Sequence, residues 1–268
     1  MLREQFLDQV AIVTGASSGI GRATSLALAK RGARLVLAAR REAQLAQLAD
    51  EIRGLGRQAL ILPTDVSHQG QVESMVASAL AEMGRVDILV CSAGEYVRAP
   101  LDRLSAAKIE HSLAVNFFGS VYPILAVLPH MRARHHGHII VVTSMDGKKG
   151  LPPDAPYVSA KFALTGFLEV LRQELYGSGV YVSNILPGRV DTEMINHLRV
   201  PRISAKIAPE VVAEEIIRAI LKRKPEVIVP FQAALLHYVN VFSPGLGDWL
   251  VRSLHLSGWE DNNPNSPS

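Results

Sequence analysis

One glycine-rich turn near the start of the chain constrains its fold more than any other feature. The apolar run Val10-Ala11-Ile12-Val13 leads directly into Thr14-Gly15-Ala16-Ser17-Ser18-Gly19-Ile20-Gly21, and a segment rich in alanine and leucine continues to Lys30. This pattern predicts a buried strand, a tight turn and a helix whose N-terminus faces the turn. Free backbone N–H groups and the positive end of the helix dipole would then form an anion site that fits a pyrophosphate. A tight connection that binds nothing is the alternative.

The spacing of the glycines narrows the choice of motif. Gly15, Gly19 and Gly21 do not fit the dinucleotide fingerprint G-x-G-x-x-G, and Arg22 stands where a P-loop needs a lysine. With Thr14 in front, the turn resembles the T-G-x-x-x-G-x-G turn of short-chain dehydrogenases/reductases. The resemblance implies a dinucleotide cofactor held by Gly15, Ser17, Ser18, Gly19, Ile20 and Gly21.

Length and composition favour one large α/β domain. The chain has 268 residues, of which 48% are hydrophobic, enough for one core without a separate substrate domain. Its one cysteine, Cys91, excludes internal disulfides and suits a reducing compartment. We find no secretory signal and no uninterrupted apolar run of about 18 residues, so we expect a cytoplasmic protein. The net charge is only +3 and the basic residues are scattered, which argues against nucleic-acid binding.

Apolar, β-branched stretches alternate with helical patterns along residues 1–230. The predicted strands are 10–13, 34–39, 59–63, 87–91, 137–143, 180–186 and 226–229. The predicted helices after the first are 42–54, 72–83, 105–134, 155–176 and 209–222. This alternation implies a single α/β domain with a Rossmann-type doubly wound, parallel seven-stranded sheet and helices on both faces. In such a sheet ligands bind at the carboxyl ends of the strands, where functional residues should lie.

The most specific signal is the segment Tyr157-Val158-Ser159-Ala160-Lys161. Residues four apart share a helix face, so Tyr157 and Lys161 present a phenol and an ammonium side by side. Such a pair is usually a surface feature, but Ser144 follows the fifth predicted strand and Asn116 lies in the long predicted helix. The short-chain family places catalytic partners at both positions. The resemblance therefore implies that Asn116, Ser144, Tyr157 and Lys161 are catalytic.

The chemistry that this family performs needs such side chains. A ketone that accepts hydride develops alkoxide charge, which must be stabilised and then protonated. Tyrosine is a poor acid near neutral pH, but we expect the adjacent Lys161 and the oxidised cofactor to lower the pKa of Tyr157. Ser144 would donate a second hydrogen bond to the substrate oxygen. The resemblance also implies that Lys161 binds the nicotinamide ribose and that Asn116 holds a water linking Lys161 to solvent.

The end of the second predicted strand indicates which nicotinamide cofactor is bound. Ala39 stands where a carboxylate would take the ribose hydroxyls of NAD, and Arg40 and Arg41 follow. A guanidinium there would pair with the extra phosphate of NADP, with Ser17 as the second contact. The alternative is that both arginines only solvate a loop. We predict NADP, with NADPH as the reducing form.

Three further segments match the family and complete the expected cofactor site. Asp65-Val66 corresponds to the family's adenine-binding pair, although a turn aspartate is the alternative. Ala93-Gly94 keeps the part of the family's Asn-Asn-Ala-Gly that passes the cofactor ribose. Cys91 and Ser92 replace both asparagines, which puts in doubt a hydrogen bond that an Asn at position 92 would make. The P-G-x-V-x-T segment over the nicotinamide is matched by Pro187, Gly188, Val190 and Thr192.

The resemblance covers residues 8 to about 230 and implies an NADPH-dependent ketone reductase acting on a small molecule. An NAD(P)-dependent alcohol or hydroxysteroid dehydrogenase working oxidatively is one alternative, and a non-catalytic NADP-binding scaffold is another. The long helices around 105–134 and 155–177 resemble those through which family members pair, so we expect a homodimer or homotetramer. The histidine-rich run at 134–138 lacks partners at ligand spacing, and we predict no metal site.

The resemblance is weakest in the C-terminal extension, residues 231–257. Phe231, Leu235, Tyr238 and Phe242 fall on one helical face, the break Ser243-Pro244-Gly245 follows, and a second amphipathic segment comes next. The two segments either pack on the core or a subunit interface, or form a hydrophobic flap over the substrate mouth that also rests on a membrane surface. A flap would suit lipid-like or steroid-like ketones. Residues 258–268, rich in Asn, Pro and Ser, are expected to form a disordered tail.

Overall fold

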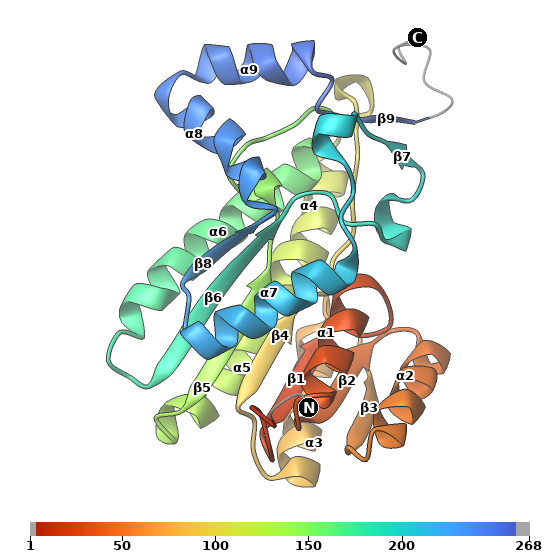
Figure 1. Ribbon diagram of the computed structural model, residues 1–268, viewed down its shortest axis with the longest axis vertical. Helices are drawn as coiled ribbons and strands as arrows, with labels where there is room; N and C mark the ends of the chain where they lie inside the picture. The colour runs from red at the N-terminus through yellow and green to blue at the C-terminus, as the bar shows by residue number, and fades with distance from the viewer. Residues whose placement is uncertain (1–3, 261–268) are drawn as a thin grey trace.

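A seven-stranded parallel sheet, in the order β3-β2-β1-β4-β5-β6-β8, organises the computed structural model, which describes residues 4–260 (Figure 1). Its strands are β1 (Val10–Thr14), β2 (Arg34–Ala39), β3 (Ala59–Pro63), β4 (Ile88–Cys91), β5 (Gly137–Val142), β6 (Val180–Pro187) and β8 (Glu226–Val229). The predicted single-domain, Rossmann-type fold is confirmed. The strand order reverses between β1 and β4, which is where ligands bind in such sheets.

Helices cover both faces of this sheet. One face carries α1 (Gly19–Ala29), α2 (Glu42–Gly54) and α7 (Pro209–Lys222), and the other carries α3 (Gln69–Met83), α5 (Gly119–Ala133) and α6 (Ala155–Glu174). Successive side chains of β1 enter opposite cores, with Ala11 and Val13 on the first face and Val10 and Ile12 on the second. Burial on both faces explains why the strands are continuous apolar runs in the sequence.

The long helix expected over residues 105–134 is interrupted. Five residues of π-helix, Ala114–Phe118, separate α4 (Ala106–Leu113) from α5 and contain Asn116. A π turn holds one extra residue, which apolar periodicity does not reveal, and such turns are frequent at functional sites. The stretch Ala106–Ala133 is also long and apolar enough to cross a membrane by length and composition. Its two α-helices pack against α6 and α3, which buries part of this apolar stretch.

The C-terminal extension folds as two helices joined at a break. α8 (Ala234–Phe242) follows a short 3-10 turn, and α9 (Pro244–Ser253) begins directly after Ser243. Figure 1 shows both helices, in blue, at one end of the molecule beyond the sheet. We expected a disordered tail from residue 258 onward. The structure instead has a strand at its beginning, because β9 (Trp259–Glu260) pairs antiparallel with β7 (Leu198–Arg199). Residues 261–268 lie outside the described residues.

Candidate active site

A cleft of about 1260 Å³ lies across the carboxyl ends of the strands, between the loops that follow β1 to β6 and the helices α8 and α9. It is lined by nearly all of the predicted site residues: Gly15, Ser17, Ser18, Gly19, Ile20, Arg40, Arg41, Asp65, Val66, Ala93, Gly94, Ser144, Tyr157, Lys161, Pro187, Gly188, Val190 and Thr192. The other two lie just behind its wall, Gly21 against Gly15 and Asn116 against Gly94. The fold therefore brings the predicted residues to one place.

The turn after β1 leaves no room for a side chain at Gly15 or Gly21. Gly15 has φ +65°, and a Cβ atom there would lie 2.7 Å from the backbone nitrogen of Ala93. A Cβ atom on Gly21 would overlap the carbonyl oxygen of Gly15. The turn, the start of α1 and the loop after β4 therefore pack backbone against backbone, and the first N–H groups of α1 open into the cleft. This cradle fits the pyrophosphate of a dinucleotide.

Thr14 supports the end of β4, where the family's usual asparagine is replaced. Its Oγ1 accepts hydrogen bonds from the backbone nitrogens of Ser92 at 3.2 Å and Ala93 at 3.4 Å. These bonds join the ends of two neighbouring strands at the cofactor side of the cleft. The change to Ser92 thus leaves the central strand ends tied together.

Arg41, rather than Arg40, contacts the glycine turn. The Arg41 guanidinium donates to Oγ of Ser17 at 3.2 Å and to Oγ of Ser18 at 2.6 Å, and it pairs with Glu193 at 2.8 Å. Arg40 is exposed and acts on Asp65 through its charge. Two guanidinium groups and two hydroxyls therefore gather at the end of β2, a donor set that fits a phosphate.

Asp65 makes a turn with its own neighbour. Its Oδ1 accepts hydrogen bonds from the backbone nitrogen of Ser67 at 3.0 Å and from Oγ of Ser67 at 2.7 Å. Partial burial opposes ionisation, but the two Ser67 bonds and the charge of Arg40 hold the pKa of Asp65 below its ordinary value. The side chain lines the cleft and stabilises this turn, while its contact with the adenine stays a prediction.

Three predicted catalytic side chains meet above the end of β5. Tyr157 and Lys161 are buried on α6, and Nζ of Lys161 lies 5.5 Å from the ring centre of Tyr157. Nζ also donates to the carbonyl oxygen of Val142 at 3.2 Å. Ser144 follows β5, and its hydroxyl acts to lower the pKa of Tyr157. Burial lowers the pKa of Lys161 to about 8, while the charge of Asp146 opposes this shift.

The pKa of Tyr157 is raised in the protein alone, whereas we expected Lys161 and the oxidised cofactor to lower it. Burial is the largest cause, because it penalises the phenolate. The carboxylates of Asp146 and Asp154 add repulsion, and the Ser144 hydroxyl works in the opposite direction. The Tyr157 phenol therefore stays protonated near neutral pH, for reasons that were not visible in the sequence.

Asn116 holds the loop after β4 against the π-helical segment. Its Nδ2 donates to the carbonyl oxygen of Glu95 at 2.9 Å and to Oγ of Ser112 at 3.1 Å, and its Oδ1 accepts from the nitrogen of Glu95 at 3.0 Å. Both amide protons are thus committed within the protein. The side chain positions the Gly94 backbone, while its expected role toward a water stays a prediction.

A buried ionic cluster beside Tyr157 was missed in the sequence. Asp154 is almost fully buried and accepts hydrogen bonds from Nε of Arg98 at 3.0 Å and from the hydroxyl of Tyr96. The Tyr96 ring stands edge-on to the Tyr157 ring, with 5.0 Å between their centres. The only sequence signal was the nearness of Asp154 to Tyr157, three positions apart. Nothing in the sequence placed Tyr96 or Arg98 there.

The C-terminal helices close the cleft with apolar side chains. Their cleft-lining residues include Leu235, Leu236, Val239, Leu250 and Leu254. Lys149, in the loop after β5, donates to Oδ1 of Asn240 at 2.8 Å and pairs with Asp248 at 2.5 Å. This contact joins α8 and α9 to the loop that carries Ser144.

Two arginines hold the end of the extension. Arg189, in the loop after β6, donates to the carbonyl oxygen of Leu256 and to Oγ of Ser204. Arg98 donates to the carbonyl oxygen of Ser257 at 3.3 Å. Because both arginines come from loops at the cleft, the extension is attached directly to the walls of the candidate active site.

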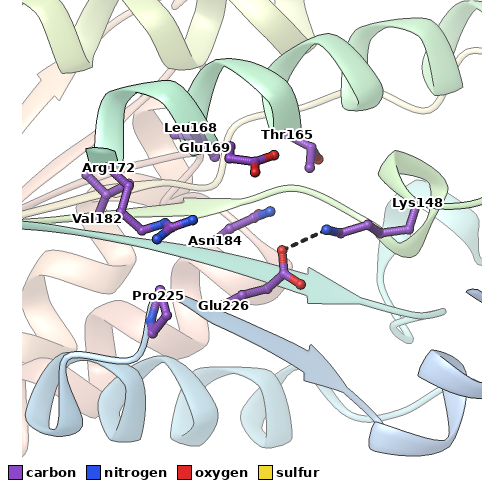
Figure 2. Close-up of a pocket in the computed structure, with 9 residues that line it drawn as sticks. All are labelled: Lys148, Thr165, Leu168, Glu169, Arg172, Val182, Asn184, Pro225 and Glu226. Carbon is purple, nitrogen blue, oxygen red and sulfur yellow. Dashed lines mark ion pairs between the residues drawn. The ribbon is translucent and has the colours of Figure 1, made fainter. Parts of the chain in front are cut away.

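A second, smaller hollow of about 270 Å³ lies between α6, β6 and β8 and shares no lining residue with the cleft. Figure 2 shows Lys148 and Glu226 facing each other across it, 3.0 Å apart.

Among residues 4–260, no group of three or more His, Cys, Asp or Glu side chains is placed to hold a metal ion. Outside this hollow, His138 of β5 lies buried 2.8 Å from Oγ of Ser183, and burial lowers the pKa of His138 to about 4.

Comparison with known proteins identifies the family. The sequence profile described as short chain dehydrogenase matches residues 9–202. The chain belongs to the short-chain dehydrogenase/reductase family. Its relatives include a dehydrogenase/reductase SDR family protein 7-like from Drosophila melanogaster, 32% identical over 93% of this chain and 81% of that protein. Another is the ketoacyl reductase HetN of a Nostoc species, 33% identical over 81% of this chain and 77% of its own length.

Solved structures show the same fold. A short-chain dehydrogenase/reductase from Burkholderia phymatum in complex with NAD gives a TM-score of 0.83 at 25% identity, covering 98% of this chain and 99% of that one. An alcohol dehydrogenase from Thermococcus sibiricus complexed with 5-hydroxy-NADP gives 0.73 at 28% identity, covering 82% and 95%. The protein is therefore an oxidoreductase of a family that acts on CH–OH or C=O groups of small molecules with a nicotinamide cofactor.

Proposed function

We propose that the protein is an NADPH-dependent reductase that converts apolar ketones to secondary alcohols. The observation that carries the proposal is the meeting of Ser144, Tyr157 and Lys161 in one cleft with the leucines of α8 and α9. One relative is named a ketoacyl reductase and one solved structure an alcohol dehydrogenase, and both names fit chemistry at a carbonyl or alcohol carbon.

The four predicted catalytic residues take different parts in this reaction. When bound, NADPH supplies the hydride. Tyr157 protonates the alkoxide, Ser144 hydrogen-bonds its oxygen, and Lys161 holds the nicotinamide ribose. Asn116 keeps the loop after β4 in place. The raised pKa of Tyr157 keeps its phenol protonated near neutral pH, as the proton donor of a reduction must be.

The cofactor preference rests on the end of β2. Arg41 already touches Ser17 and Ser18, Arg40 lies beside it, and Ala39 offers no carboxylate to the ribose. This donor set suits the extra phosphate of NADPH. We assign the remaining predicted cofactor residues to the same cofactor: Gly15, Gly19, Ile20, Gly21, Asp65, Val66, Ala93, Gly94, Pro187, Gly188, Val190 and Thr192.

We assign residues 231–257 the role of a flap over the substrate and of a membrane contact for an otherwise cytoplasmic protein. Many exposed side chains of this extension are apolar, and Phe231 is 78% and Phe242 87% exposed. The one acidic residue of the extension, Asp248, is paired with Lys149. Such a surface suits the interface of a bilayer. Flotation with liposomes tests this part, and a chain that stays unbound would contradict it.

We also propose a homodimer or homotetramer that pairs through α5 and α6. These helices expose Leu125, Phe162 and Val170, each about half-exposed. Large exposed apolar side chains of this kind suit an interface between copies of the chain. Light scattering after size-exclusion chromatography measures the mass, and a monomer at micromolar concentration would rule this part out.

The central test is turnover of a ketone panel with NADPH and with NADH. We expect NADPH oxidation with long-chain or polycyclic ketones, weaker activity with short ones, and a preference for NADPH. Product analysis must show the secondary alcohol in equal amount to the NADPH consumed. Tight NADPH binding without any turnover would instead support the non-catalytic scaffold, and faster oxidation of alcohols with NAD would support the oxidative alternative.

A further inference from the structure

The hydroxyl of Ser144 is engaged twice by Asp146, two positions further along the chain. Oγ of Ser144 accepts a hydrogen bond from the backbone nitrogen of Asp146 at 3.0 Å and donates its proton to Oδ2 of Asp146 at 3.1 Å. A serine hydroxyl has one proton to donate. While that proton is given to the carboxylate, it is unavailable to the oxygen of a substrate.

Asp146 has no strong counter-ion that would settle its charge. Among residues 4–260, no lysine, arginine or histidine lies within 4.0 Å of its carboxylate. The titratable and charged groups that act on it, or on which it acts, come from α6 and its N-terminus and from the loops after β4 and β6: Asp154, Tyr157, Lys161, Tyr96 and Arg189. Its side chain lines the cleft, so it can exchange a proton with solvent or with a bound substrate.

We propose that Asp146 is a positioning residue that controls whether Ser144 can donate its hydrogen bond to the substrate oxygen. When Asp146 is protonated, its own O–H donates to Oγ of Ser144 and the Ser144 proton is released toward the substrate. When Asp146 is ionised, its carboxylate accepts the Ser144 hydrogen bond, and the Ser144 O–H then points away from the substrate. This inference rests on the proposed function, because Ser144 must be the second donor to the developing alkoxide.

The electrostatics of the site bring the protonation of Asp146 close to neutral pH. Burial and the repulsion of Asp154 raise the pKa of Asp146 to about 7, although the Ser144 hydrogen bond, Arg189 and Lys161 oppose the shift. Since Asp146 loses its proton as the pH rises through this value, reduction should slow on the alkaline side. The same carboxylate raises the pKa of Tyr157. Asp146 therefore influences both Ser144, through a hydrogen bond, and Tyr157, through its charge.

The test measures single-turnover NADPH oxidation with a saturating ketone between about pH 5.5 and 9, for the parent and for Asp146→Ala. The parent rate should fall as the pH rises through about 7. In Asp146→Ala the Ser144 hydroxyl can donate to the substrate at every pH, so the rate at about pH 9 should exceed the parent rate by about tenfold. This gain is smaller than the loss of rate that usually follows removal of one hydrogen-bond donor to an oxyanion. Asp146→Asn keeps the shape of the side chain and so controls for an effect on folding. Its rate should fall with rising pH no more steeply than the rate of the alanine variant.

A double-mutant cycle separates this role from effects on Lys161 or Tyr157. If Asp146 acts through Ser144, Asp146→Ala should change the rate at high pH in the parent but not in a Ser144→Ala background. Equal effects in both backgrounds, or a lower rate in Asp146→Ala, would overturn the inference while leaving the proposed function standing. Absence of any turnover in the parent would remove the proposed function and this inference with it. Glu95→Gln, a carboxylate of the same cleft paired with His111 at 3.1 Å, serves as the matched control and should keep the parent's pH dependence.

Discussion

The two halves of the cleft are built from different interactions. On the cofactor side, the turn after β1 meets the loop after β4 through backbone atoms, as Gly15 against Ala93 shows. On the substrate side, α8 and α9 are held by side chains, chiefly Lys149 with Asp248. A backbone contact tolerates no added atom, whereas a side-chain contact can be exchanged one residue at a time. The fold therefore fixes where the cofactor binds, and individual residues of this chain decide what is presented to it.

Tyr157 stands where the two halves meet, and its loss should have the largest effect. Tyr157→Phe removes the proton donor and one hydrogen bond to the alkoxide, so turnover should fall by about 10²–10⁴-fold. NADPH binding, measured by fluorescence titration, should change little because the ring remains. Tyr176→Phe is the control, since Tyr176 follows the same helix and is 94% exposed. A Tyr157→Phe enzyme with more than about a tenth of the parent rate would remove Tyr157 from this role.

The same contrast explains which parts could be predicted from the sequence. Strands such as β1 are buried on both faces, so their apolar runs are unmistakable, and the glycines of the turn are recognisable because no other residue fits there. The Tyr157 and Lys161 pair was recognisable from its spacing together with Ser144 and Asn116, which stand where the family places catalytic partners. These features depend on the backbone or on a fixed separation along one helix, and a linear pattern records both.

The rest depends on contacts between residues far apart in the chain. Asp146 and Asp154 each look like a solvated loop carboxylate, and only tertiary packing buries them beside Tyr157. The strand Trp259–Glu260 forms because Leu198–Arg199 lies alongside it. The residues next to it in the sequence favour a loop. Charged residues in loops and short strands carry no periodicity, so sequence patterns cannot place them.

A smaller effect is expected where the cofactor half would bind the extra phosphate of NADPH, because side chains rather than backbone atoms make the contacts there. Arg41→Leu should raise the Kd for NADPH by about 10- to 100-fold, because hydrogen bonds to charged groups are worth about 1.5–3 kcal/mol. Arg40→Leu should raise it less, because Arg40 lies exposed and makes no contact with Ser17 or Ser18. Isothermal titration with NADPH and NADH measures both. Equal losses for the two cofactors would show that Arg41 stabilises the turn and does not select the phosphate.

The smallest effect should come from loosening the substrate half alone. Lys149→Met removes the ion pair to Asp248 and the hydrogen bond to Asn240 that attach α8 and α9 to the loop after β5. Since a partly exposed ion pair contributes at most about 1 kcal/mol, the KM for a long apolar ketone should rise by up to about fivefold.

The neighbouring Lys148 provides the matched control for this change. It pairs with Glu226 at 3.0 Å in the separate hollow, so Lys148→Met removes a similar charge without touching the extension and should leave the KM as it is (Figure 2). Asp248→Asn breaks the pair of Lys149 from the other side and should reproduce the Lys149→Met result. If Lys149→Met raised the KM of short and long ketones equally while Asp248→Asn did nothing, Lys149 would contact the substrate itself. The side-chain attachment of the extension would then play no part in substrate choice.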